Sequence, residues 1–129
     1  MKVLSRLSES REYYFDEGCH ILELSNTPDD PEVSIARARV EPGVTTRLHR
    51  LVNTTERYVI LQGEGRVDIG DNDPIDVVRG DVIRIHAGVS QRITNTSSED
   101  LIFLVICNPR FVPDCYVDID EKSGSSVNE

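Results

Sequence analysis

The chain has 129 residues, a length typical of one domain with a single sizeable hydrophobic core. It carries 14 Lys and Arg against 23 Asp and Glu, which gives a net charge of −9 at pH 7. An acidic surface repels phosphate backbones, so this balance argues against a nucleic-acid partner. No stretch approaches the roughly 20 consecutive apolar residues that a membrane-spanning helix requires, and the N-terminal residues lack the apolar core of a signal peptide. We therefore expect an acidic cytoplasmic protein with no membrane partner.

Three cysteines are present, Cys19, Cys107 and Cys115. They are too few and too irregularly spaced for a disulfide framework, and no Cys-x-x-Cys pair occurs. Reduced thiols are the expected state in the cytoplasm.

Short apolar segments separated by turn residues follow one another along the chain. In residues 32–40, small and apolar side chains alternate with larger and charged ones, which is the period-two pattern of a strand with two different faces. The Gly-Glu-Gly sequence at 63–65 predicts a hairpin between the segments on either side. Strands are predicted over residues 20–25, 32–40, 57–63, 65–70, 81–86, 90–96 and 101–107. Several short strands at regular spacing are typical of a sandwich or a barrel.

The two ends depart from this pattern. A short helix near residues 8–14 is the only helix that we expect. Residues 108–122 contain two prolines, which interrupt sheet pairing, so they are predicted to form an extended segment laid over the barrel. Residues 123–129 are polar and predict a C-terminal tail, which leaves residues 1–122 as a single domain.

A first motif is built around the histidine nearest the middle of the chain. Five residues separate Gly43 from His49, and Leu51 lies two positions further on. Four residues then lead to Glu56, and six more to Gly63. This pattern resembles the first motif of the cupin family, G-x5-H-x-H-x(3,4)-E-x6-G, with Leu51 in place of the second histidine.

A second motif follows about twenty residues later. Gly80 is followed by five residues and His86, then by Gly88, Gln91 and Asn95. The spacing resembles the second cupin motif, G-x5-P-x-G-x2-H-x3-N. His86 takes the place of the proline, and Gln91 takes the place of the histidine.

The resemblance implies an all-β fold, the double-stranded β-helix or jelly-roll barrel of the cupins, here with an extended C-terminal segment. It also implies a homodimer, which would cover the edge strands that an open jelly roll exposes. In the family, three imidazoles and one carboxylate hold a divalent ion at the barrel mouth. The matching residues in this sequence are His49, Glu56 and Gln91, a reduced set for Fe, Mn, Zn or Ni. The same three side chains can instead satisfy one another through hydrogen bonds inside a polar barrel.

Three further residues are candidates for binding a substrate. Tyr58 lies two positions after Glu56 and faces the same interior, either toward a ligand or as a core aromatic residue. Arg47 suits a carboxylate-bearing ligand, or else lies at the rim beside one of the many acids. His86 can act as an acid or base, or simply be solvated.

The resemblance therefore implies a small cupin that binds a divalent metal and a small polar, carboxylate-bearing ligand, as an enzyme of oxygenase, isomerase or lyase type. The alternative is a non-catalytic ligand-binding or sensor cupin with a degenerate or empty metal site. A metal-free acid/base isomerase that uses His49 or His86 with Tyr58 is a third hypothesis. The sequence leaves open whether the protein is an enzyme, because one fold hosts many chemistries.

Overall fold

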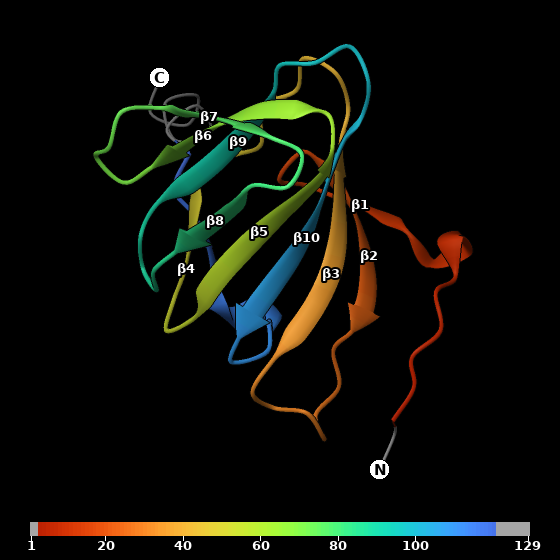
Figure 1. Cartoon of the computed structure of the whole chain (residues 1–129). Coiled ribbons are helices and arrows are strands. Elements are labelled where there is room, and N and C mark those ends of the chain that lie inside the picture. Colours follow the sequence, from red (N-terminus) through yellow and green to blue (C-terminus); the bar gives the residue numbers. More distant parts are fainter. Residues whose placement is uncertain (1–2, 121–129) are drawn as a thin grey trace, which may run out of the picture.

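The computed structural model describes residues 3–120, which form two antiparallel sheets facing each other across a hydrophobic core (Figure 1). The strands of the six-stranded sheet, in spatial order, are β1 (Tyr13–Phe15), β2 (Cys19–Ser25), β3 (Ser34–Val40), β10 (Leu101–Asn108), β5 (Thr55–Gln62) and β8 (Val82–Ile85). Those of the five-stranded sheet are β11 (Tyr116–Asp118), β4 (His49–Leu51), β9 (Gln91–Asn95), β6 (Glu64–Ile69) and β7 (Ile75–Val78). Two short 3-10 turns complete the described chain, η1 (Glu9–Arg11) and η2 (Pro113–Cys115). The predicted all-β jelly-roll fold is confirmed.

Alternation along the strands builds the core. In β3 the small side chains Ser34, Ala38 and Val40 are buried, while Arg37 and Arg39 point to the outer face. The main core cluster joins both sheets and includes Ile60, Val67, Ile85, Ile93, Leu101 and Phe103. The period-two pattern of residues 32–40 therefore predicted the two faces correctly.

The predicted hairpin at residues 63–65 is wrong. β5 pairs with β8 and β10, whereas β6 pairs with β7 and β9, so the chain crosses from one sheet to the other at Gly63. Gly63 has a φ of +84°, and a Cβ atom there would lie 3.0 Å from the carbonyl oxygen of Asp100. The glycine therefore serves a tight crossover between the sheets, a role that has the same local sequence signal as a hairpin turn.

The ends of the chain also differ from expectation. The predicted helix near residues 8–14 is reduced to η1, and Tyr13 already begins β1. After β10, the segment that was expected to lie over the barrel forms η2 and then β11, which pairs with β4 as an edge strand of the five-stranded sheet. The predicted tail, 123–129, lies outside the described residues. No helix within residues 3–120 has the length and apolar character needed to cross a membrane.

Candidate functional site

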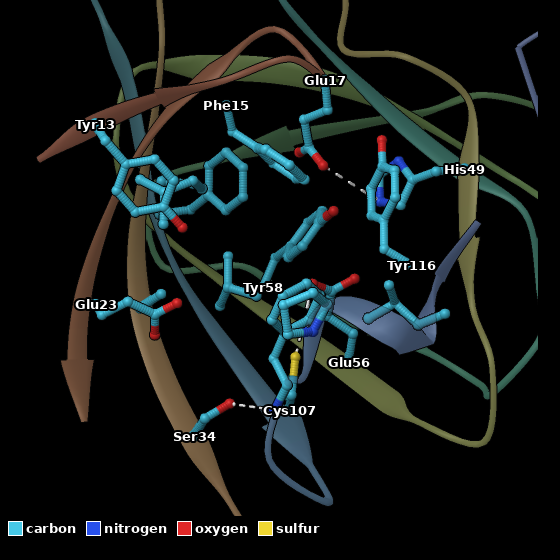
Figure 2. A pocket seen from close by; sticks show the side chains of 18 residues that line it. Tyr13, Phe15, Glu17, Glu23, Ser34, His49, Glu56, Tyr58, Cys107 and Tyr116 are labelled. Carbon is cyan, nitrogen blue, oxygen red and sulfur yellow. Dashed lines mark hydrogen bonds and ion pairs between the residues drawn. The ribbon is translucent and has the colours of Figure 1, made fainter. Parts of the chain in front are cut away.

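A cavity of about 270 Å³ lies between the two sheets (Figure 2). Most of its wall is apolar, and it includes six aromatic side chains: Tyr13, Phe15, Tyr58, Phe103, Phe111 and Tyr116. Its imidazole and carboxyl groups are those of His49, Glu17, Glu23 and Glu56. Within residues 3–120, no Lys or Arg side chain lines this cavity.

His49 projects into the cavity from β4, and only 2% of its surface is exposed. Its Nδ1 atom lies 2.8 Å from the carbonyl oxygen of Arg47. A carbonyl only accepts, so Nδ1 carries the hydrogen, and in the neutral ring Nε2 is left with its lone pair. The ring stacks on Tyr116, with centroids 4.8 Å apart, which fixes its orientation. The free Nε2 atom lies 3.8 Å from Oε1 of Glu17.

Glu17 is a residue of the site that the sequence did not reveal. It sits in the turn between β1 and β2, and its carbonyl oxygen accepts a hydrogen bond of 2.7 Å from the amide of Arg47. This bond ties the turn to the residues that precede His49. The Glu17 carboxylate points toward His49 in Figure 2, and its Oε2 accepts a hydrogen bond of 3.1 Å from the thiol of Cys19. No motif flags Glu17, because its place depends on how the first strands fold over the barrel.

Glu56 projects from β5 and is 7% exposed. Burial raises the pKa of its carboxyl group to about 8, and the negative charge of Glu17 adds to the rise. Hydrogen bonding by the side chains of Gln91 and Cys107 lowers the pKa of Glu56 and so offsets part of this rise. The Cys107 thiol lies 3.8 Å from Oε2, whereas the buried Oε1 atom has no hydrogen-bond partner within the described part of the chain.

Tyr58 and Gln91 meet behind this group. The Tyr58 hydroxyl donates a hydrogen bond to the Gln91 amide oxygen, and both side chains are buried. Burial raises the pKa of Tyr58 well above its ordinary value, and the charge of Glu56 raises it further, so the side chain remains a phenol near neutral pH. Tyr58 lines the cavity, but Gln91 is set back from it and pairs with His49 across β4 and β9.

The other two predicted ligand-binding residues lie elsewhere. Arg47 forms an ion pair with Asp118 of β11, with 2.8 Å between Nε and Oδ2. His86 is exposed in the loop between β8 and β9. Neither side chain lines the cavity, and their role in binding a substrate stays a prediction.

The donors at this site match a divalent cation only in part. His49 offers Nε2 and Glu56 offers an unpartnered Oε1, both suitable ligands. Leu51 lines the cavity without any donor atom, and the oxygen of Gln91 is already used by Tyr58. Across residues 3–120, no cluster of three or more His, Cys, Asp and Glu side chains is arranged to hold a metal.

Comparisons with known proteins agree with this architecture. The cupin domain family model matches residues 36–107. An uncharacterized protein of Methanocaldococcus jannaschii is 30% identical over 114 residues, which cover 86% of this chain and 90% of that protein. An oxalate-binding protein of Thermotoga maritima is 40% identical over 72 residues, which cover 55% of this chain and 58% of that protein.

Solved structures show the same fold. A predicted oxalate decarboxylase from Thermotoga maritima superposes with a TM-score of 0.73 at 25% identity, covering 83% of this chain and 99% of that one. KdgF from a Halomonas species also reaches a TM-score of 0.73, at 13% identity, covering 84% of this chain and 95% of that one. The family match spans more than half of the sequence and includes both motifs. The chain therefore belongs to the cupin domain family.

Proposed function

We propose that the protein is a ligand-binding cupin, which holds a small molecule in the cavity between its sheets. The apolar body of the ligand would pack against the aromatic side chains, and its polar end would meet His49, Glu17 and Glu56. Ligand sites of this kind are concave and mostly apolar, with a few convergent polar groups that fix orientation.

One observation carries the proposal. Oε1 of Glu56 is buried at the cavity wall and has no hydrogen-bond partner among residues 3–120. An unsatisfied buried acceptor costs about 1–3 kcal/mol, so such atoms call for an explanation. A ligand that forms a hydrogen bond with Glu56 would supply the missing partner.

The test is a fragment screen by ligand-observed NMR, with fragments that carry acidic, neutral and basic ends. The comparison protein is Ala36→Phe, because Ala36 lines the cavity and is only half-buried, so a larger side chain can enter the empty space. We expect fragments that bind the wild-type protein and not this variant. If no fragment distinguishes the two folded proteins, the cavity is not a ligand site.

A second candidate function is metal-dependent chemistry at the same place. The hydrogen bond from Nδ1 of His49 to the Arg47 carbonyl favours it, because metal-binding histidines are typically oriented by such a bond. His49 and Glu56 would hold the ion, with Gln91 as the third predicted ligand if its bond to Tyr58 opens. A bound ion would supply Lewis-acid chemistry.

Metal analysis of protein purified without a histidine tag tests this second candidate. Stoichiometric Fe, Mn, Zn or Ni that is lost in His49→Ala would support it. Sub-stoichiometric metal, together with no gain in thermal stability on adding these ions, would exclude it and leave the ligand-binding proposal standing.

A further inference from the structure

The charge of the cavity wall indicates which ligands it accepts. Three acidic side chains line it, those of Glu17, Glu23 and Glu56, and His49 is the sole basic side chain among its described lining residues. Arg47, the residue expected to attract a carboxylate, is paired with Asp118 outside the cavity. A ligand carboxylate would therefore enter a partly buried space lined by acidic side chains, with no Lys or Arg among the described lining residues to pair with it, which is costly in a medium of low dielectric constant.

The three acidic side chains differ in the partners that the protein provides for them. Glu17 faces His49 and accepts the thiol of Cys19. Glu23 lies across the cavity in Figure 2, where burial raises the pKa of its carboxyl group against the smaller opposing effects of Asn26 and Arg110. For Glu56, the described residues provide neither an ion pair nor a partner for Oε1. An ammonium group at Glu56 would stabilise the carboxylate form of this side chain and would supply the hydrogen bond that Oε1 lacks.

The aromatic walls suit an organic cation better than a bare ion. The rings of Tyr58 and Phe103 lie 4.5 Å apart, and those of Phe15 and Tyr116 lie 5.1 Å apart in an edge arrangement. Figure 2 shows the rings of Phe15, Tyr58 and Tyr116 grouped around the space between Glu17 and Glu56. Aromatic faces attract ammonium groups, and a protonated amine has up to three N–H donors for the carboxylates.

We infer that the ligand is a small amine, with its ammonium group at Glu56 and Glu17 and its apolar body against the aromatic walls. This inference rests on the proposed function and adds the chemical class of the ligand. It replaces the carboxylate-bearing ligand that the sequence suggested.

Three probes that share one phenyl body test the class: 2-phenylethylamine, 2-phenylethanol and 3-phenylpropionate. Each is titrated by calorimetry into protein freed of metal by a chelator, at constant salt. We expect the amine to bind about tenfold or more tightly than the alcohol, and the propionate to bind weakest. Equal affinities, or tighter binding of the propionate, would overturn the inference while the ligand-binding function stands. If no probe binds the wild-type protein more tightly than Ala36→Phe, both the amine inference and the ligand-binding function are wrong.

A matched pair of variants locates the contact. Glu56→Gln keeps the size of the side chain but cannot form a carboxylate, and Glu64→Gln makes the same change on the exposed surface of β6. We expect Glu56→Gln to lower the affinity for the amine to that for the alcohol, about tenfold, without changing the affinity for the alcohol. Glu64→Gln should leave both affinities as in the wild type. An undiminished preference for the amine in Glu56→Gln would show that Glu56 is not the anchor.

Discussion

The hydroxyl of Tyr58 on β5 donates a hydrogen bond to the amide oxygen of Gln91 on β9, so that a buried polar bond joins the two sheets behind the cavity. Tyr58 is 4% exposed and Gln91 is 1% exposed. The sequence assigned the two residues to different tasks, one to a substrate and the other to a metal. In the structure each satisfies the other, which holds the rear wall of the cavity in place.

Removing the Tyr58 hydroxyl should destabilise the fold. Tyr58→Phe keeps the ring against Phe103 but leaves the oxygen of Gln91 buried without its donor. We expect a loss of about 1–3 kcal/mol in the free energy of unfolding, measured by urea denaturation. Tyr14→Phe is the control. Tyr14 is 60% exposed, so this variant should lose little free energy of unfolding.

The double variant Tyr58→Phe, Gln91→Met separates the lost bond from lost packing. Replacing both partners by apolar groups removes the unsatisfied oxygen, so part of the stability should return. If Tyr58→Phe alone is as stable as the wild type, the hydrogen bond does not contribute to holding the sheets together.

The raised pKa of Glu56 predicts a loss of stability at high pH. The folded-state pKa of about 8 lies above the ordinary value of 4.5, so the native protein keeps a proton that the unfolded chain releases between these values. Stability therefore falls as pH rises from about 4.5 to 8, by an amount on the order of a few kcal/mol when the shift is fully expressed. Glu56→Gln cannot ionise and should escape this loss.

Thermal unfolding of metal-free protein at several pH values checks this prediction. We expect Glu56→Gln to match the wild type at pH near 5 and to melt at a higher temperature at pH near 9. Glu64→Gln, whose carboxyl group is exposed, should follow the wild type at both values. A constant difference between Glu56→Gln and the wild type across this range would contradict the raised pKa.

Periodicity and motif spacing were enough to predict the barrel. The alternation in residues 32–40 placed the buried and outer faces of β3, and the spacing of His49 and Leu51 placed both side chains toward the cavity. Tyr58 was likewise predicted to share a face with Glu56, and both line the cavity. These features are local, since side chains two apart in a strand lie on the same side.

The remaining features depend on contacts between distant segments. Glu17 enters the site because the β1–β2 turn is bonded to the chain at Arg47, a pairing that leaves no local pattern. The pairing of Tyr116–Asp118 with β4 also joins distant segments. It was missed because the prolines that precede it argued against a strand. The Gly-Glu-Gly signal was ambiguous in a different way, because a hairpin turn and a crossover between sheets both need a glycine with positive φ.

The crossover at Gly63 can be tested directly. In Gly63→Ala the new Cβ atom would lie 3.0 Å from the Asp100 carbonyl oxygen and 3.2 Å from Cα of Leu101, at a φ of +84°. Gly88 has a similar φ of +81°, but an added Cβ atom there would meet nothing within 4 Å, so Gly88→Ala carries the backbone strain alone. We expect both variants to lose stability, and Gly63→Ala to lose about 1–3 kcal/mol more in urea denaturation. Equal losses would mean that the crossover can move away from the added methyl group.

Asn95 of the second motif should be the most sensitive polar position away from the cavity. Its side-chain nitrogen donates to the carbonyl oxygens of Val40 and Glu99, both at 2.8 Å, and its oxygen accepts from the amide and hydroxyl of Ser97. Asn95→Asp keeps the shape but turns a carboxylate oxygen toward two carbonyl oxygens in a site that is 1% exposed. Asn72→Asp makes the same chemical change at an exposed turn and serves as the control.

We expect Asn95→Asp to lower the free energy of unfolding by about 2–5 kcal/mol at neutral pH, because the variant buries an uncompensated charge and removes two hydrogen-bond donors. The loss should shrink as the pH falls toward 4, since a protonated Asp can again donate to one of the carbonyls. Asn72→Asp should show neither effect. If Asn95→Asp matches Asn72→Asp across this range in urea denaturation, these hydrogen bonds do not hold the strand end in place.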